Sequence, residues 1–303
     1  MGIQKKKYIA LVLIFICMPI FLSASYAALD SKDLYRISGS NDSNIDESIF
    51  VYALQSVGFK ELLGSGFDIA VIDIDDCSLD LSQLIEFQSK DRVLLSYLSI
   101  GEAEDYRSYW TDGWRAGNPD FIYEENLLWP GNYKVKYWHY DWQKIIYSQL
   151  DKIIENGFGG AYLDIVDAYK YFEDIGVSDA AAMMIDFVVG LSEYSKSINS
   201  DFLIIPQNAE ILLDDPVYFD AIDGIGKEEL YFVEGKKQSD RNIELSSYYL
   251  DKVKRAGKDV FIISYVTEAK SIKEVINNAK ENNYYYFIAK RELDSIDCLS
   301  KNI

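Results

Sequence analysis

Histidine and cysteine are scarce in this chain. Its one histidine, His139, excludes zinc sites built on several histidines, and any Ser-His-Asp or Cys-His site would have to use it. Because His139 lies between Trp138 and Tyr140, we expect it to pack or to contact a ligand. Three cysteines are too few for a disulfide framework, although Cys77 and Cys298 could form one disulfide or stay as two thiols. Aspartate and glutamate are therefore the expected chemical groups.

Positive charge is also in short supply. The chain has 30 Lys and Arg against 49 Asp and Glu, a net charge of -19. Loss of the three lysines at residues 5–7, in a segment predicted to be removed, lowers this to -22. Such a surface repels nucleic acid and anionic lipid and attracts cations. We therefore expect no nucleic-acid partner, while composition alone does not establish a cationic ligand.

The one long hydrophobic run lies at the N-terminus and is typical of a signal peptide. Three lysines precede about 15 mostly apolar residues, from Tyr8 to Leu22, which is short for a membrane span. Small residues at Ser25 and Ala27 predict cleavage after Ala27. An uncleaved anchor is the alternative, and Ile16 before Cys17 disfavours a lipoprotein. We predict a signal peptide over residues 1–27, secretion or a periplasmic or cell-surface location, and no stable membrane insertion after cleavage.

Residues 28–47 are polar and are predicted to form a flexible tail, and the folded domain is predicted over residues 48–303. Within that domain, β-rich apolar runs alternate with helical stretches. The eight runs span residues 49–54, 67–74, 92–100, 160–166, 202–207, 221–226, 260–266 and 284–289. Helices are predicted over residues 80–90, 141–157, 178–199, 241–259 and 269–283.

This alternation predicts a single α/β domain with the (β/α)8 TIM barrel fold. Such barrels contain about 250 residues, close to the length from Ser48 to Ile303. The alternative, a doubly wound open sheet, usually has a glycine-rich nucleotide-binding loop after its first strand. The first strand here is followed by QSVGFKELLGSGFD, which contains no GxGxxG motif. The barrel is therefore favoured, and no cofactor is expected.

Carboxylates and amides follow the predicted strands, where the active site of a barrel lies. In strand order they include Asp73, Glu102, Asp164, Asp167, Gln207, Asn208, Glu228 and Glu229, with Tyr265 after the seventh strand. Any one of these acids could instead cap a helix. Capping does not account for the acidic SIGEAE stretch or the Gln-Asn pair, so a site at the barrel mouth is indicated.

Carboxylates without histidine at a barrel mouth indicate glycoside hydrolysis. One acid protonates the leaving oxygen, and a second acts as nucleophile or activates water. Asp164 pairs poorly with its near neighbour Asp167, and a pair across the mouth, such as Asp164 with Glu228, fits better. All five tryptophans lie between residues 110 and 142. Their flat rings suit sugars and cations, so this segment either lines a cleft or packs on itself.

Four motifs give a more specific indication. They are YLSIGEAEDYRSYW (97–110), GFGGAYLDIVDAYKYF (157–172), PQNAE (206–210) and DGIGKEELYF (223–232). Together they resemble glycoside hydrolase family 114, the endo-α-1,4-polygalactosaminidase-like barrels, over most of residues 48–290. The resemblance implies a (β/α)8 barrel that cleaves α-1,4-linked, galactosamine-containing polysaccharide. It also implies Asp164 and Glu228 as the catalytic pair, with Glu229 as the adjacent alternative and Asp167 as the second acid of its motif.

The leading prediction is an exported glycoside hydrolase in which Asp164 is nucleophile or base and Glu228 is general acid. The predicted substrate-binding residues are Asp73, Glu102, Asp167, Asn208, Tyr265 and Trp110. The predicted partner is a polysaccharide, which is cationic if its galactosamine is de-N-acetylated; no metal is expected. Two alternatives stay open. One is a non-catalytic carbohydrate-binding barrel, and the other is a metal-dependent deacetylase or hydrolase that uses the acids at positions 73, 75 and 76.

Overall fold

The structure, a computed structural model, describes residues 49–77, 81–88 and 92–299. The predicted signal peptide and tail lie outside these residues. Within the described ranges, no helix combines the length and the apolar character that crossing a membrane requires.

Eight parallel strands form the barrel, one at each of the eight predicted positions. They are β1 (Phe50–Tyr52), β2 (Ile69–Ile72), β3 (Val93–Ser99), β7 (Gly160–Asp164), β8 (Leu203–Pro206), β9 (Gly224–Glu228), β12 (Asp259–Ser264) and β13 (Tyr285–Ile288). Hydrogen bonds link β1-β2-β3-β7-β8 and, separately, β9-β12-β13. A parallel bridge from Gln207 to Gly226 joins β8 to β9. Phe50 of β1 packs against Phe287 of β13, so the first strand lies beside the last. The TIM barrel prediction is confirmed.

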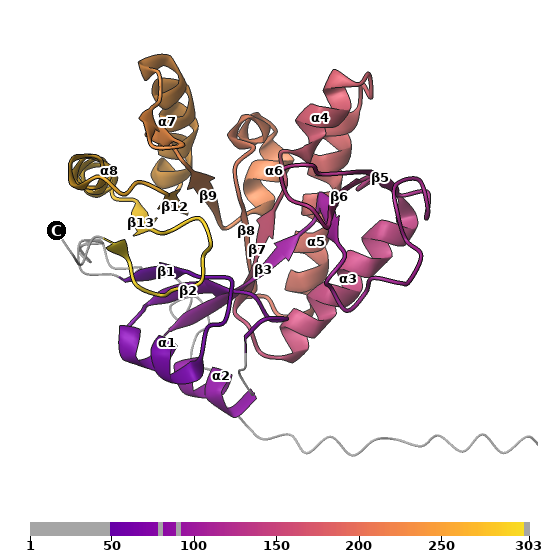
Figure 1. The fold of residues 1–303 in the computed structure, drawn as a ribbon, viewed down its shortest axis with the longest axis horizontal. Coiled ribbons are helices and arrows are strands. Elements are labelled where there is room, and N and C mark those ends of the chain that lie inside the picture. The colour runs from indigo at the N-terminus through magenta and orange to yellow at the C-terminus, as the bar shows by residue number, and fades with distance from the viewer. Residues whose placement is uncertain (1–48, 78–80, 89–91, 300–303) are drawn as a thin grey trace, which may run out of the picture. The chain divides into compact units, whose positions relative to one another are not determined.

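Helices follow the strands and lie outside them (Figure 1). The five predicted helices are confirmed as α2 (Leu81–Gln88), α3 (Tyr140–Glu155), α5 (Ala180–Ile198), α7 (Asp240–Arg255) and α8 (Ala269–Glu281). Those not predicted are α1 (Phe59–Ser65), α4 (Ala168–Asp174), α6 (Pro216–Ala221) and the 3-10 helix η2 (Glu210–Asp214). At five to seven residues, these four are too short for an apolar period to be recognised.

Helix α3 shows how the sequence specifies one of these elements and what the single histidine does. Its buried face consists of Trp142, Ile146, Leu150 and Ile153, which recur at helical spacing. His139 precedes the helix, and its Nδ1 accepts a hydrogen bond from the backbone amide of Asp141 at 3.2 Å. The histidine therefore caps the helix N-terminus.

Two small antiparallel sheets interrupt the alternation of strand and helix. Strands β4 (Glu102–Glu104), β5 (Ile122–Glu125) and β6 (Asn132–Val135) pair in the order β4-β6-β5 between β3 and α3 (Figure 1). A hairpin of β10 (Phe232–Val233) and β11 (Lys236–Lys237) follows β9. Neither sheet was predicted. Because β4 begins three residues after β3 ends, the larger sheet stands at the barrel mouth.

Aromatic side chains fill the barrel interior and fix which residues point inward. The rings of Tyr52 and Tyr162 lie 5.3 Å apart, and those of Phe50 and Phe261 lie 5.0 Å apart. Each pair joins strands that are not neighbours in the sheet, so these side chains meet inside the barrel. Side chains alternate between the two faces of a strand. Asp164, two residues after Tyr162, therefore also points inward, at the mouth.

Candidate active site

Asp164, the last residue of β7, is held by three hydrogen bonds. Tyr97 Oη donates to Oδ2 at 2.8 Å, Gln207 Nε2 donates to Oδ1 at 2.8 Å, and the amide of Ile165 donates to Oδ1 at 2.7 Å. Burial and the charge of Glu228 nevertheless raise the pKa of Asp164 to about 7. A carboxyl group that titrates near neutral pH and has a fixed orientation is suited to acid–base or nucleophilic chemistry.

Glu228 ends β9 and is the second carboxyl group of the site. Tyr265 Oη donates to its Oε1, and the amide of Glu228 donates to Asn208 Oδ1 at 3.2 Å. Burial raises the pKa of Glu228, while the hydrogen bond from Tyr265 and the charge of Arg291 act in the opposite direction. Glu228 is thus a partly buried acid whose proton is retained to a higher pH than that of an exposed glutamate.

Asp164 and Glu228 influence one another across the mouth. After burial, the charge of Glu228 is the next cause of the raised pKa of Asp164. Burial also raises the pKa values of the Tyr52 and Tyr162 hydroxyls, and the charges of both carboxylates add to this. Their strands, β7 and β9, flank β8, so the two backbones lie about 10 Å apart at the usual strand spacing. The predicted pair is therefore a coupled pair of carboxyl groups on one side of the barrel.

A glycine in β9 allows a buried chain of hydrogen bonds to reach Asp164. Tyr162 Oη donates to Gln207 Oε1 at 2.9 Å, and Gln207 in turn donates to Asp164. A Cβ atom at Gly226 would lie only 1.7 Å from the Tyr162 hydroxyl. Position 226 therefore requires glycine. The two hydrogen bonds of Gln207 fix its side chain so that the amide nitrogen, not the oxygen, faces Asp164.

Left-handed backbone conformations directly follow Asp164, Gln207 and Glu228. The residues concerned are Ile165 (φ 56°), Asn208 (φ 59°), Ala209 (φ 54°) and Glu229 (φ 52°). Residues with a Cβ atom avoid this region, and a β-branched residue such as isoleucine does so most strongly. Each such residue costs on the order of 1–3 kcal/mol. Strain is thus concentrated where the chain turns away from the site.

A cleft of about 580 Å³ is lined in part by Tyr97, whose hydroxyl donates to Asp164. Neither Asp164 nor Glu228 lines the cleft, so it adjoins the carboxyl pair through Tyr97. Other lining residues are Asp73, Glu104, Tyr106, Arg107, Trp129 and Asn132. They come from the segment after β2 and from the small sheet at the mouth. Of the tryptophans, all of which fall in the described part of the chain, Trp129 is the one that lines this cleft.

Arg107 forms the charged centre of this cleft. Its Nη1 lies 2.7 Å from Asp73, its Nε lies 2.5 Å from Glu104, and its guanidinium carbon lies 5.8 Å from the centre of the Tyr97 ring. Burial raises the pKa of Asp73, and the charge of Arg107 opposes this shift. Arg107 therefore neutralises two buried acids and contacts the tyrosine that holds Asp164.

The acids at positions 73, 75 and 76 have partners within the chain. Asp75 pairs with Lys152 and lies 3.4 Å from Arg107, and Asp76 accepts a hydrogen bond from a backbone amide at 2.5 Å. Throughout residues 49–77, 81–88 and 92–299, no group of three or more Asp, Glu, His or Cys side chains is arranged to hold a metal ion.

The predicted substrate residues occupy several places. Asn208 and Tyr265 contact Glu228, and Asp73 lines the cleft. Asp167 immediately precedes α4, and its charge contributes to the raised pKa of Asp164.

Glu102 and Trp110 lie within the small sheet and its surroundings. Glu102 is buried, accepts a hydrogen bond from Asn126 at 2.9 Å, and has a pKa raised by burial. The Trp110 ring packs 5.0 Å from Tyr133 and 5.3 Å from Trp114. Both side chains thus support the sheet that carries one wall of the cleft.

Tyr97, Arg107 and Arg291 were not predicted as site residues, and Gln207 was predicted at the barrel mouth without a role. Tyr97 lies within an apolar run and looks like a core residue in the sequence. It is two residues before Ser99, so both side chains lie on the inward face of β3, and this spacing could have indicated it. Gln207 stands beside the predicted Asn208. Arg107 is the first basic residue after the acidic SIGEAE stretch. Arg291 carries no sequence signal, because the fold alone places it 4.3 Å over the Tyr265 ring.

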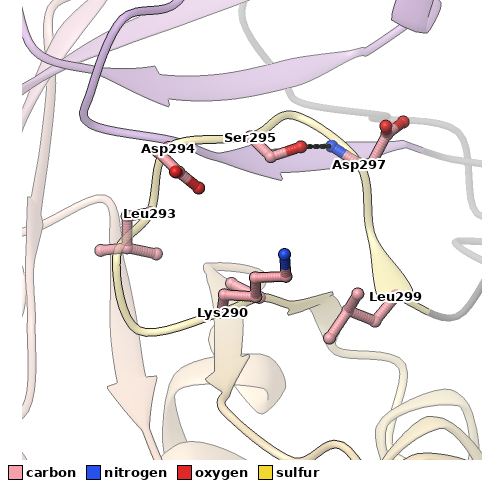
Figure 2. Close-up of a pocket in the computed structure, with 7 residues that line it drawn as sticks. Lys290, Leu293, Asp294, Ser295, Asp297 and Leu299 are labelled. Carbon is pink, nitrogen blue, oxygen red and sulfur yellow. Dashed lines mark hydrogen bonds between the residues drawn. The ribbon is translucent and has the colours of Figure 1, made fainter.

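A second cavity, of about 200 Å³, lies within the C-terminal segment 289–299 (Figure 2). Figure 2 shows the Lys290 side chain pointing into the ring that this segment forms. The carbonyl of Leu293 accepts hydrogen bonds from the amides of Leu54 and Gln55, so the segment runs from β13 back to the end of β1. Neither catalytic candidate lines this cavity.

Comparison with known proteins gives a family match and two similar proteins from other organisms. The sequence profile described as "Glycoside-hydrolase family GH114" matches residues 41–302. An uncharacterized protein of Methanocaldococcus jannaschii is 35% identical over 85% of this chain and 80% of that protein. An uncharacterized protein of Thermotoga maritima is 36% identical over 80% of this chain and 77% of that protein.

Two solved structures resemble the fold. Ega3 of Aspergillus fumigatus, in complex with galactosamine, superposes with a TM-score of 0.67 at 19% identity, covering 83% of this chain and 94% of that one. The glycoside hydrolase domain of PelA from Pseudomonas aeruginosa gives 0.67 at 13% identity, covering 82% and 97%. At these identities the likeness supports the barrel fold.

Proposed function

This chain belongs to glycoside hydrolase family GH114, and we propose that it hydrolyses an α-1,4-linked, galactosamine-containing polysaccharide with Asp164 and Glu228 as the catalytic pair. One observation carries the proposal. Two partly buried, mutually coupled carboxyl groups with raised pKa values stand at the barrel mouth, and Tyr97, which donates to one of them, lines a cleft of about 580 Å³. Glycoside hydrolysis requires two such groups, one to protonate the leaving oxygen and one to act as nucleophile or base.

The contacts of the two acids support different roles. Asp164 receives three hydrogen-bond donors, which stabilise its charged form. We therefore assign the proton that the coupled pair retains to Glu228. Glu228 would protonate the leaving oxygen, and Asp164 would attack the sugar or activate water.

The charge of the cleft supports an amino sugar as substrate. Its lining contains four carboxylates, at positions 73, 75, 76 and 104, and one guanidinium, Arg107. A surplus of negative charge concentrates a cationic polymer such as de-N-acetylated galactosaminan. Activity on that polymer should then fall as salt is added. Salt-independent activity, or a preference for the fully acetylated polymer, would count against a cationic substrate.

Product release from de-N-acetylated α-1,4-galactosamine polymer tests the reaction. We expect oligosaccharides from the parent protein and a loss on the order of 10²–10⁴-fold in Asp164→Asn and in Glu228→Gln. Glu229→Gln is the matched control, because Glu229 is adjacent but contacts Arg291 and a loop amide. If Glu229→Gln alone abolished turnover, the acid would be Glu229. Polymer binding without any product from the parent would favour a non-catalytic carbohydrate-binding barrel.

Export is part of the proposal and rests on the sequence of residues 1–27. Secretion of the full chain by a bacterial host, followed by N-terminal sequencing, tests it. The expected first residue is Ala28, and a mature protein that begins at Met1 would contradict cleavage.

A further inference from the structure

Two exposed aromatic side chains stand at the rim of the cleft. Tyr106 is 65% exposed and Trp129 is 53% exposed, and both line the cleft. Trp142, by contrast, is fully buried. Exposed aromatic rings that gather at the edge of a cleft mark a binding surface, because they add little to the packing of the core.

Hydrogen bonds hold the loop that carries Trp129 in one conformation. This loop, residues 126–132, joins β5 to β6. The amide of Trp129 donates to Asn126 O at 3.0 Å, that of Asn132 donates to Trp129 O at 3.0 Å, and that of Asn126 donates to Asn132 O at 2.7 Å. The ring of Trp129 is therefore presented on a closed, internally bonded turn, which lowers the entropy lost on binding.

The same loop is joined to the segment that carries Tyr106. The amide of Asp105 donates to the carbonyl of Gly131 at 2.9 Å. Gly131 has φ 92°, a backbone conformation that residues with a Cβ atom rarely adopt, so this turn favours glycine. Tyr106 Oη donates to Glu104 at 2.8 Å, and the Arg107 guanidinium carbon lies 5.3 Å from the centre of its ring. Both rings are thus positioned before any ligand binds.

We propose that Tyr106 and Trp129 form an aromatic platform that binds a hexosamine unit of the polymer away from the bond that is cleaved. The inference rests on the proposed function and adds two specificity-determining residues to it. The flat rings match the apolar C–H face of a pyranose ring. Tyr97 connects the same cleft to Asp164, so a chain bound on the platform continues to the carboxyl pair. The platform should therefore increase the affinity for long polymer chains and leave the affinity for oligomers too short to reach it unchanged.

Trp129→Ala and Tyr106→Ala test this platform. We expect KM for the de-N-acetylated polymer to rise about tenfold in each, which corresponds to about 1.4 kcal/mol, with little change in kcat. Activity on the shortest cleaved oligosaccharide should be unchanged, and Trp129→Phe should retain most of the affinity. Leu128→Ala is the matched control, since Leu128 is 86% exposed on the same loop but outside the cleft lining.

A second measurement separates the platform from the reaction. The dissociation constant of the polymer is measured in an Asp164→Asn background, with and without Trp129→Ala. A tenfold weakening by Trp129→Ala supports the platform, even if the parent releases no product and hydrolysis fails. Equal binding by the Trp129→Ala and Leu128→Ala variants, with an active parent, overturns the platform and leaves hydrolysis standing. A parent that neither cleaves nor binds the polymer overturns both.

Discussion

Replacing Asp164 with asparagine should stabilise the folded protein at neutral pH while it removes turnover. Burial and the charge of Glu228 raise the pKa of Asp164 from 3.8 to about 7. Between these pH values the folded carboxyl pair keeps a proton that the same residues lose in the unfolded chain. The free energy of unfolding of the parent therefore falls as pH rises through this window. About three pH units at about 1.36 kcal/mol each give an upper limit of about 4 kcal/mol.

Asparagine suits this comparison because it has nearly the shape of aspartate. Its carbonyl oxygen can accept the hydrogen bonds from Gln207 and from the amide of Ile165, and its amide can donate to Tyr97. We expect the variant to be more stable by about 2–4 kcal/mol at pH 8, and the difference to vanish near pH 4.

Urea unfolding of the parent and of Asp164→Asn, at intervals from pH 4 to pH 8, measures this difference. Asp167→Asn is the comparison, because Asp167 lies outside the three hydrogen bonds to Asp164 and its charge is only a minor cause of the raised pKa of Asp164, so its pH-dependent effect should be much smaller. A gap between parent and variant that is equal at pH 4 and pH 8 would refute the reasoning, since the effect would then not arise from the proton that the carboxyl pair retains.

Three further substitutions probe the surroundings of the pair. Tyr265→Phe removes a donor to Glu228, so the pKa of Glu228 should rise and the alkaline limb of the pH–activity profile should move up by about one unit. Gly226→Ala places a Cβ atom 1.7 Å from Tyr162 Oη and should lower the free energy of unfolding in urea by about 1–3 kcal/mol. Arg107→Met removes the ion-pair partner of the buried carboxylates of Asp73 and Glu104 and should lower the free energy of unfolding by about 3–5 kcal/mol at pH 7, again by urea unfolding.

Two substitutions elsewhere control for these effects. Tyr137→Phe also removes a buried hydroxyl, one that donates to the carbonyl of Ala180 at 2.7 Å, and should leave the pH profile in place. Gly64→Ala in α1 meets nothing within 4 Å and should be neutral or stabilising by up to about 1 kcal/mol. An equal shift of the pH–activity profile in Tyr137→Phe and Tyr265→Phe would contradict a local effect on Glu228. An equal loss of unfolding free energy in Gly64→Ala and Gly226→Ala would contradict the predicted clash with Tyr162.

The barrel could be predicted because its strands are continuous apolar runs between amphipathic helices. Strand β9 is the least apolar of the eight runs in the sequence, since it has Gly224 and Gly226 where the other strands have larger apolar residues. The structure supplies the reason: a Cβ atom at Gly224 would lie 2.6 Å from Asp259 O, and Gly226 gives room to Tyr162. The sheet of β4, β5 and β6 escaped prediction because its strands of three or four residues lie in an aromatic segment without a clear period.

The positions of Asp164 and Glu228 at strand ends could be predicted, and their catalytic roles stay a proposal. Their partners could not be recognised, because contact requires the fold. Tyr97 is 67 residues away from Asp164 in the sequence and lies inside an apolar run. Arg291 approaches Glu228 only because the chain after β13 returns across the mouth. The local sequence thus indicates where the two candidate acids lie, but not which distant residues contact them and shift their pKa values.

The closure of the barrel by its last strand has a consequence for the timing of biosynthesis. Strand β13 pairs with β12 and packs beside β1, and Leu293 then binds the amides of Leu54 and Gln55. A nascent chain that ends before these residues has an open ring, in which water reaches the carboxyl pair and Arg291 is missing. We therefore expect a chain that ends before β13 to have no hydrolytic activity, so activity would first appear late in synthesis, when β13 and the segment after it have joined the barrel.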